Sequence, residues 1–385
     1  METNRLSWID SLRGYAIFAV LAYHVYQALP GLNPNWTLIL DFGSMGVQLF
    51  FMVSAFTIFM TLDQARDQGK LSFISFYIRR VFRIMPLFYF ALAIGIATLL
   101  MESLIGSSNP ILGDDNSLFS KAFTTLTFTS AWIPAFCPTL VPGGWSIAVE
   151  MWFYLVAPLL FLSLRTINRV LIFVFGSLIF RFLINEGLTH FLPIKPALFH
   201  SFIYFWLPNQ LPIFSLGILA YFIFKIFNIT AVNNGRENSG IINKINNREN
   251  RVNPSFYLFF ALYLLGSIIK GFKVLFPFHF LFGISFFLIM LFMMNRPRNF
   301  LANRIMVHLG TISYSAYISH FFVIKYTHSW FFGWMGNLNL VQEWQFIFFL
   351  LWTVLITVIV SEGLYRLIEK PGQRLGKVLI GKLNG

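Results

Sequence analysis

The chain has 385 residues, of which 57% are hydrophobic, 19% are aromatic and only 11% are charged. A typical soluble domain has about 25% charged residues, so this composition excludes a soluble protein and indicates a polytopic membrane protein. The formal net charge of +13 would favour a nucleic-acid partner for a soluble protein. In a membrane protein, cationic loops that set the topology explain it, and we expect no nucleic-acid partner.

The candidate spans follow from the length that a helix needs to cross the hydrocarbon layer, about 20 apolar residues. On this rule the chain contains about ten transmembrane helices, and we expect an all-α membrane protein with a single bundle over residues 1–385. The predicted spans are 11–30, 43–62, 86–105, 147–164, 168–186, 202–224, 255–272, 275–294, 307–326 and 345–365.

Lysine and arginine lie mainly on one side of these spans if the N-terminus is placed in the cytoplasm. Because cytoplasmic loops carry an excess of these residues, we predict that both termini are cytoplasmic. Two long connections then stand out. One is an outer loop at 106–144, and the other is an Asn-rich cytoplasmic segment at 228–254, which we interpret as a mobile linker without a catalytic role.

The first span carries three ionisable side chains, Asp10, Arg13 and His24. Such groups inside a membrane are costly and are usually functional. Arg13 and His24 are close to three helical turns apart, so they share a face and lie about 16 Å apart along the axis. Asp10 is within pairing reach of Arg13. The structural alternative is a topological arginine and a histidine hydrogen-bonded in the bundle, but the shared face favours a functional pair.

The stretch FYIRRVFRIMPLFYF, residues 76–90, contains Arg79, Arg80 and Arg83. Arg80 and Arg83 are three residues apart and share a helix face, which suits phosphate groups because guanidinium binds them bidentately. Ordinary positive charge on the cytoplasmic side explains the cluster equally well, so both interpretations stay open.

The stretch PGGWSIAVEMWFYLVAP, residues 142–158, begins with Gly143 and Gly144, which break the chain. We expect Ser146 to cap the helix that follows. Glu150 then falls in the first turns of the fourth span, near the outer face. An acid there can simply stabilise a helix N-terminus, but the cost of burying it favours a role in a site.

The stretch GTISYSAYISHFFVIKY, residues 310–326, places Ser313, Tyr317 and His320 on one helix face. Ser54, in LFFMVSAF, adds a hydroxyl on the second span. Small and hydroxyl residues on membrane helices serve packing more often than ligand binding, so these four are supporting candidates.

Other common sites are missing from the sequence. The single cysteine, Cys137, excludes an internal disulfide and a cysteine metal site. The seven histidines lack H-E-x-x-H spacing, so we expect no metal site. There is no G-x-S-x-G elbow, P-loop or dinucleotide fingerprint, and the N-terminal apolar run is too long for a cleavable signal.

Six stretches, taken in order, resemble the acyltransferase family 3 proteins, the multi-spanning O-acyltransferases of cell envelopes. They are IDSLRGYAIFAVLAYH, GVQLFFMVSAF, FYIRRVFRIMPLFYF, GGWSIAVEMWFYLVAP, SYSAYISH and YRLIEKPGQRLGK. The resemblance implies transfer of an acyl group from cytoplasmic acyl-CoA, acetyl-CoA by default, to a sugar hydroxyl of an envelope glycan such as lipopolysaccharide O-antigen, capsule or exopolysaccharide. It implies a multi-pass protein of the cell inner membrane, with no permanently bound cofactor.

The family's motifs fall on particular residues of this sequence. They place the Arg-x10-His pattern on Arg13 and His24, the Arg-x-x-Arg pattern on Arg80 and Arg83, and the tryptophan–serine–glutamate stretch on Trp145, Ser146 and Glu150.

Two positions depart from the family pattern. Gln48 stands where the family often has an acid, and Ala55 follows Ser54 where the family often has glycine. We therefore expect no acidic role at position 48, and position 55 is no longer the expected point of closest helix contact. Some relatives also carry an extra-membrane esterase-like domain. This chain ends soon after its last predicted span, and we expect no such domain in it.

One mechanism joins these residues. Arg80, Arg83 and Arg13 bind the CoA phosphates at the cytoplasmic mouth, and about 16 Å along the first helix suits an extended pantetheine arm. His24 acts as general base on the sugar hydroxyl, or as a nucleophile that forms an acyl-histidine. Catalysis further involves Glu150, which hydrogen-bonds the acceptor or polarises an intermediate relay, and Asp10, which orients Arg13. The supporting residues are Ser54, Trp145, Ser146, Ser313, Tyr317 and His320.

Two other classes of protein fit parts of the sequence. A transporter or flippase for an anionic or lipid-linked substrate would use the same intramembrane charges, although the chain has no inverted repeat of the kind such proteins show. An inactive scaffold in a glycan-assembly complex is the third class. Consumption of acyl-CoA and formation of an alkali-labile ester separate the enzyme from both.

Overall fold

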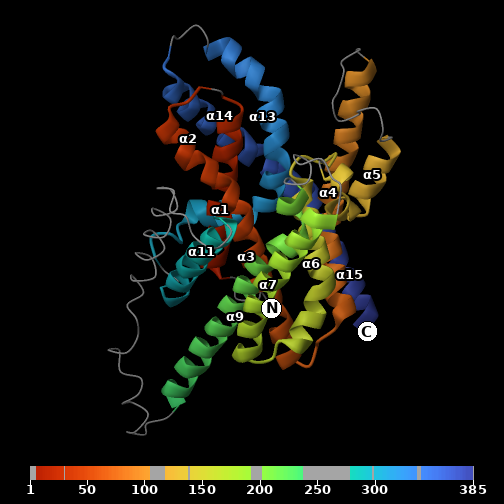
Figure 1. Cartoon of the computed structure of the whole chain (residues 1–385), viewed down its shortest axis with the longest axis vertical. Helices are drawn as coiled ribbons and strands as arrows, with labels where there is room; N and C mark the ends of the chain where they lie inside the picture. Colours follow the sequence, from red (N-terminus) through yellow and green to blue (C-terminus); the bar gives the residue numbers. More distant parts are fainter. Residues whose placement is uncertain are drawn as a thin grey trace.

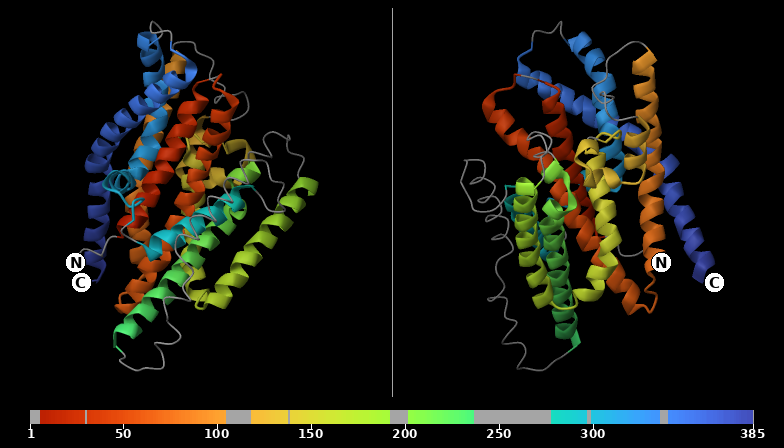
Figure 2. Two further views of the ribbon diagram at one scale, coloured as in Figure 1. Left: turned by 90° about the vertical axis from the view of Figure 1, so that its left-hand side faces the viewer. Right: turned by 45° about the vertical axis from the view of Figure 1, so that its right-hand side comes forward.

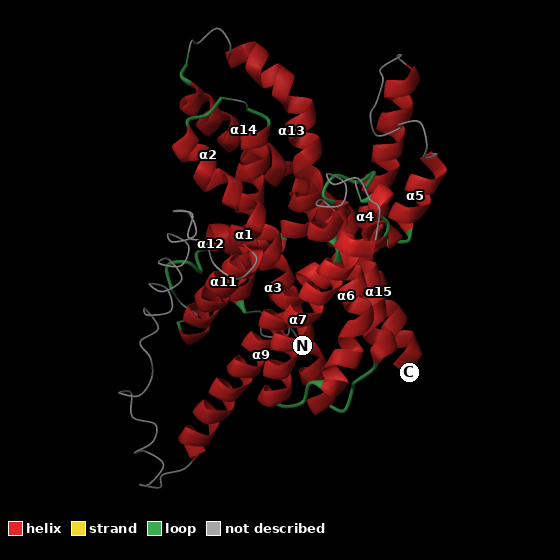
Figure 3. Ribbon diagram, in the orientation of Figure 1, coloured by secondary structure: helices red, strands yellow, loops and turns green. Residues whose placement is uncertain are grey.

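The computed structural model describes residues 6–29, 31–104, 118–137, 139–191, 202–236, 278–296, 299–335 and 340–384. These residues form helices and loops without strands (Figure 3), so the all-α prediction is confirmed for them. The longer helices are α1 (Ser7–Gln27), α3 (Gly46–Asp67), α4 (Phe73–Leu104), α6 (Gly144–Ser163), α7 (Ile167–Phe191), α9 (Leu207–Arg236), α11 (Phe278–Asn295), α13 (Ser313–Met335) and α14 (Gln342–Leu364). The shorter ones are α2 (Pro34–Asp41), α5 (Leu118–Leu126), α12 (Arg304–Thr311) and α15 (Lys370–Asn384).

Six helical segments among the described residues are long and apolar enough to cross a membrane. They are Pro34–Asp67, Phe73–Glu102, Gly144–Ser163, Ile167–Leu188, Phe202–Phe227 and Gln342–Leu383. The protein is therefore a multi-pass membrane protein by the character of its helices, while the count of ten and the sidedness of the termini stay predictions. The predicted span at 255–272 lies outside the described residues.

Three other predicted spans are not among these six segments. The eighth, predicted at 275–294, became α11, an apolar helix that is shorter than the six. The first became α1, which is long enough but carries Asp10, Arg13 and His24. The ninth, predicted at 307–326, is wrong in its bounds: the helix is interrupted at Ile312 and divides into α12 and α13. Helices α1 and α13 are buried by contacts with other parts of the protein. Because they face protein instead of lipid, they can carry polar groups that would be costly in the hydrocarbon layer.

The two predicted long connections contain more helix than expected. The outer loop at 106–144 includes α5 and two short 3₁₀ turns, Thr129–Trp132 and Pro134–Phe136. The helix α9 continues to Arg236, so the first part of the segment predicted as a linker at 228–254 is helical. The remainder of that segment lies outside the described residues.

Helix α1 lies at the centre of the molecule and organises its packing (Figures 1 and 2). It packs against α3, α12, α13 and α14, while α3 packs against α9 and α15 packs against α4. The approach to α12 is very close. A Cβ atom added to Gly310 would lie 1.7 Å from the Asp10 carbonyl oxygen, and one added to Gly14 would lie 2.0 Å from that of Met306.

A similar close approach joins α3 and α9. A Cβ atom on Gly217 would lie 2.2 Å from the Met52 carbonyl oxygen and 2.9 Å from the Ala55 side chain. Ala55 of α3 therefore does not prevent a close contact between the two helices. The small residue that allows the contact is Gly217 on α9. Small residues at such interfaces let membrane helices approach closely.

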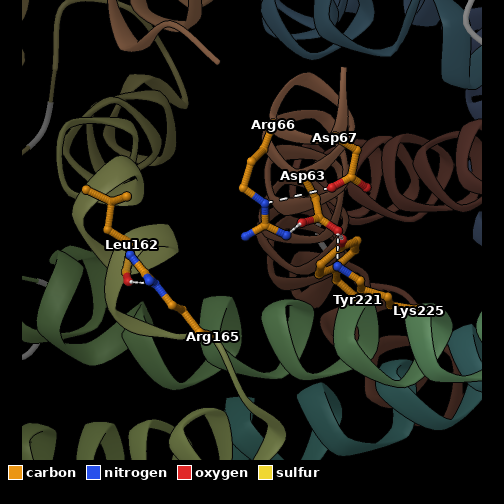
Figure 4. A network of polar contacts seen from close by, with 7 residues as sticks. All are labelled: Asp63, Arg66, Asp67, Leu162, Arg165, Tyr221 and Lys225. Carbon is orange, nitrogen blue, oxygen red and sulfur yellow. Dashed lines mark hydrogen bonds and ion pairs between the residues drawn. The ribbon is translucent and has the colours of Figure 1, made fainter. Parts of the chain in front are cut away.

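A polar cluster at the end of α3 also holds α9 (Figure 4). Asp63 is buried, and its carboxylate accepts hydrogen bonds from the Tyr221 hydroxyl and from the Lys225 ammonium group, whose Nζ lies 2.5 Å from Oδ2. Arg66 pairs with the same carboxylate. A hydrogen-bonded polar network around a buried carboxylate makes the contact between α3 and α9 more rigid.

Candidate active site

Three pockets among the described residues adjoin one another along α1. The basic pocket, about 1240 Å³, is lined by Leu6, Ile9, Asp10, Arg13, Thr57, Met60, Thr61, Gln64, Arg80, Arg83, Gly310, Thr311, Tyr365, Glu369, Gln373 and Lys377. The central pocket, about 620 Å³, is lined by Arg13, Val47, Phe50, Phe51, Ser54, Arg80, Arg83, Ile84, Ser146, Ile147, Glu150, Tyr154, Ser313, Tyr314 and Tyr317. The histidine pocket, about 960 Å³, is lined by Val20, Tyr23, His24, Gln27, Ser44, Met45, Val47, Gly143, Trp145, Tyr204, Phe205, Tyr317 and Phe321.

The pockets share walls in a fixed order. Arg13, Arg80 and Arg83 line both the basic and the central pocket, and Val47 and Tyr317 line both the central and the histidine pocket. The central pocket therefore lies between the other two. The arginines and His24 thus lie at opposite ends of this row of pockets.

The arginines of α4 differ in their environments. Arg79 is exposed, whereas Arg80 and Arg83 are half-buried and face the pockets. The Arg80 guanidinium lies over the rings of Phe76 and Tyr154, at 5.6 and 5.2 Å. Within the described part of the chain, neither Arg80 nor Arg83 forms an ion pair with a carboxylate. These two guanidinium groups form no direct ion pair among the described residues, although Glu150 and Glu369 line the same two pockets, and such groups in a pocket wall suit an anionic ligand.

Arg13 is held at the boundary of the basic and central pockets by its neighbours. Its Nη1 lies 3.6 Å from Asp10 Oδ1, and its Nη2 donates to Thr57 Oγ1 at 3.4 Å. Asp10 is 4% exposed and lines the basic pocket, at the opposite end of α1 from His24. This geometry suits a residue that positions Arg13, as the sequence suggested, and not one that touches the reacting atoms.

Glu150 is the acid of the central pocket. Its Oε1 accepts hydrogen bonds from Ser54 Oγ and from the Tyr154 hydroxyl, both at 2.5 Å. Ser54, a supporting candidate from the sequence, thus lies in the central pocket and contacts Glu150 directly. Tyr154 was missed, although it follows Glu150 by four residues on the same helix, a spacing that brings side chains together.

The start of α6 differs from the prediction. The residue before the helix is Gly143, with φ +72°, and no side chain caps the helix. Ser146 lies inside the first turn instead. Its hydroxyl and that of Tyr317 are 2.8 Å apart, and each lies 3.1 Å from the Gly143 carbonyl oxygen. The predicted cap is therefore wrong, because the left-handed glycine turns the chain and leaves Ser146 to join α6 to α13.

His24 lies half-buried in the wall of the histidine pocket, on the turn before the end of α1. Its Nδ1 is 3.0 Å from Gln27 Oε1, and Gln27 Nε2 donates to the Tyr23 hydroxyl at 2.6 Å. With the Gln27 amide in this orientation, Nδ1 donates to Oε1 and the lone pair is on Nε2, and the opposite orientation of the amide exchanges these two roles. In either case one ring nitrogen keeps a lone pair, as a general base requires. Gln27 was missed, although its three-residue spacing from His24 indicates the contact.

The supporting candidates divide between the pockets. Ser313 and Tyr317 line the central pocket, and Trp145 lines the histidine pocket with its ring 4.4 Å from that of Phe205. His320 is fully buried, with its ring centroid 5.3 Å from that of His24 and its Nδ1 3.1 Å from the Ala316 carbonyl oxygen. It lies behind His24 and fixes the packing there.

Glu369 is a site residue to which the sequence assigned no role. It lies in the π-helical turn between α14 and α15, is 2% exposed, and lines the basic pocket. Ser315 Oγ donates to its Oε2 at 2.9 Å, and Gln373 Nε2 donates to its Oε1 at 3.1 Å. It belongs to the stretch YRLIEKPGQRLGK, and π-turns often mark functional sites. No cluster of His, Cys, Asp or Glu suited to a metal ion occurs among the described residues.

The chain was compared with known proteins. The model of the acyltransferase 3 family, described as an acyltransferase domain, matches residues 6–362, and the chain belongs to this family. No solved structure matches it.

Several relatives are similar over most of the chain. A protein of Staphylococcus aureus strain COL, provisionally named an O-acetyltransferase, is 25% identical over 96% of this chain and 57% of its own length. The O-acetyltransferase OatA of Staphylococcus aureus strain NCTC 8325 is 26% identical over 96% of this chain and 58% of its own length. A provisionally named acetyltransferase of Acidianus two-tailed virus is 26% identical over 83% of this chain and 84% of its own length. This chain thus spans little more than half of the staphylococcal relatives.

Proposed function

We propose that this protein is a membrane O-acyltransferase, with acetyl-CoA as its donor and a sugar hydroxyl of an envelope polysaccharide as its acceptor. The observation that carries the proposal is the row of pockets from Arg80 and Arg83 to His24. It offers anion-binding groups at one end and an imidazole with a free lone pair at the other. The family and the names of its relatives support acyl transfer.

Acetyl-CoA fits the three pockets in one direction, with its phosphates in the basic pocket and its thioester toward the histidine pocket. The CoA phosphates lie in the basic pocket against Arg80, Arg83 and Arg13, at the cytoplasmic mouth. The pantetheine arm extends through the central pocket, whose wall includes the apolar and aromatic side chains of Val47, Phe50, Phe51, Ile84 and Ile147. The thioester then reaches the boundary of the histidine pocket, because Arg13 and His24 are about 16 Å apart along α1.

His24 moves the proton in this reaction. Its Nε2 takes the proton from the sugar hydroxyl, whose oxygen forms a bond to the acyl carbon while the carbon–sulfur bond breaks. The proton then passes from the imidazolium to the leaving CoA thiolate. General-base catalysis of this kind contributes about 10²- to 10⁴-fold to the rate. Glu150, with one oxygen held by Ser54 and Tyr154, hydrogen-bonds the acceptor or polarises an intermediate relay through its other oxygen.

The experiment follows radiolabelled acetyl from acetyl-CoA into envelope glycan in membranes that contain the protein. We expect alkali-labile label with the wild type, a loss of about 10²-fold or more with His24→Ala, and wild-type activity with His308→Ala, whose ring is exposed outside the pockets. Equal transfer by wild type and His24→Ala would contradict the mechanism. No transfer from acetyl-CoA or longer acyl-CoA donors would contradict the enzyme and favour a transporter.

A further inference from the structure

The wall of the histidine pocket includes Tyr204, and the hydrogen bonding of its hydroxyl group is determined by residues on the side away from the pocket. Tyr204 lies in its wall beside Trp145, with ring centroids 6.0 Å apart. Behind it, two glutamines are fully buried, Gln48 on α3 and Gln210 on α9. Neither lines any of the three pockets described above. The mechanism uses none of these three polar residues.

The donors and acceptors in this cluster can be assigned in one way. Gln210 lies 2.7 Å from the Tyr204 carbonyl oxygen, and since a carbonyl can only accept, the Gln210 atom there is Nε2. Gln210 Oε1 therefore points to Gln48, 3.3 Å away. An oxygen in that place requires a donor, so the facing atom of Gln48 is its Nε2.

The same Gln48 Nε2 lies 3.1 Å from the Tyr204 hydroxyl. The amide nitrogen can only donate, so the phenol oxygen accepts and the phenol keeps its hydrogen. Within the described residues the Tyr204 hydroxyl has no other hydrogen-bond partner. Among the described residues, the buried Gln48 Oε1 has no hydrogen-bond partner. Leaving this oxygen unpaired costs free energy, and the cost follows from the orientation in which the amide nitrogen donates to Tyr204.

We propose that the Tyr204 hydroxyl donates a hydrogen bond to an oxygen of the acceptor sugar in the histidine pocket, and that Gln48 is the positioning residue that keeps this hydrogen available. The inference rests on the proposed function. Aromatic walls with a few placed polar groups are typical of small-molecule sites, and Trp145 and Phe205 supply such a wall beside Tyr204.

This assignment gives a functional reason for Gln48, which stands where the family pattern often has an acid. A carboxylate at position 48 can only accept, so it would take the hydrogen of Tyr204 and turn it away from the pocket. The amide at position 48 does the reverse. The residue at position 48 therefore decides whether Tyr204 offers the acceptor a hydrogen or only an oxygen.

The test measures steady-state kinetics with the neutral oligosaccharide released from the glycan that wild-type membranes label. We expect Tyr204→Phe to raise the acceptor KM about 3- to 10-fold, the range of one neutral hydrogen bond, with the KM for acetyl-CoA unchanged. Gln48→Glu should raise the acceptor KM by a similar factor. Gln48→Met removes the amide without adding an acceptor that could take the Tyr204 hydrogen, so it should raise the acceptor KM by a smaller factor than Gln48→Glu.

Each outcome separates the two proposals. An unchanged acceptor KM in Tyr204→Phe, with transfer by the wild type intact, would overturn the role of Tyr204 alone. Equal effects of Gln48→Met and Gln48→Glu would show that Gln48 acts through packing, and would overturn its positioning role. A change in the KM of both substrates would indicate a general disturbance and also count against the inference. Absence of transfer by the wild type would overturn the proposed function itself.

Discussion

Three arginines on one turn and a half of α4 are chemically identical but differ in what surrounds them. Arg79 is exposed, and Arg80 and Arg83 line two pockets. Desolvated guanidinium groups bind phosphate more strongly than exposed ones because water and salt screen them less. The position of each arginine around α4, and not its charge, therefore decides how much it contributes to phosphate binding.

We predict that Arg83→Ala raises the KM for acetyl-CoA about 10-fold or more, since a hydrogen bond to a charged group contributes about 1.5–3 kcal/mol. The measurement is the initial rate against acetyl-CoA concentration at saturating acceptor. Arg79→Ala is the matched control and should leave this KM unchanged. Equal effects of the two substitutions would mean that the arginines act through the general surface charge.

At the scale of helices, the contact between α1 and α12 determines where Arg13 stands. The backbones touch at Gly310 and at Gly14, so no side chain separates the two helices there. The interruption at Ile312 turns the chain from α12 into α13. It lets α12 lie against the start of α1 while α13 lines the central and histidine pockets.

We predict that Gly310→Ala destabilises the protein by about 2 kcal/mol or more, because the added methyl group overlaps the Asp10 carbonyl and forces the helices apart. The matched control is Gly333→Ala on α13, where nothing lies within 4 Å of the added atom and alanine favours the helix. Thermal unfolding of the detergent-solubilised variants measures the difference. A Gly310→Ala variant as stable as wild type would show that the contact can relax.

At the scale of the whole molecule, the first and last helices meet at one pocket. Asp10 and Arg13 near the start of α1 and Gln373 and Lys377 of α15 all line the basic pocket. The described ends of the chain therefore lie on the same side of the molecule, and which side of the membrane this is stays a prediction. His24, at the other end of α1, lies toward the opposite side.

We predict that this arrangement shows in the labelling of single cysteines. In a Cys137→Ser background, Lys121→Cys on α5 should react with a membrane-impermeant maleimide in intact cells. Leu383→Cys on α15, whose native side chain is 63% exposed, should react only after the inner membrane is permeabilised. The reverse pattern would invert the topology and place the basic pocket outside the cell.

The sequence by itself determined the class of protein and most of the helices, and it named many of the residues that line the three pockets. Composition and span length indicate helices in a membrane, and helical periodicity places Arg13 and His24 on one face, because both follow from local geometry. The family motifs selected Arg80, Arg83 and Glu150, which the structure brings to one pocket. Short spacings would also have found Tyr154 and Gln27.

Only the tertiary structure decided which polar groups meet across helices. The bond from Ser54 to Glu150 joins α3 to α6, that from Ser315 to Glu369 joins α13 to the π-turn, and that from Gln48 to Tyr204 reaches across more than 150 residues. The interruption at Ile312 likewise depends on the approach of α12 to α1. Helix periodicity fixes the face on which a side chain lies, but the partner of that face is set by packing between segments distant in the chain.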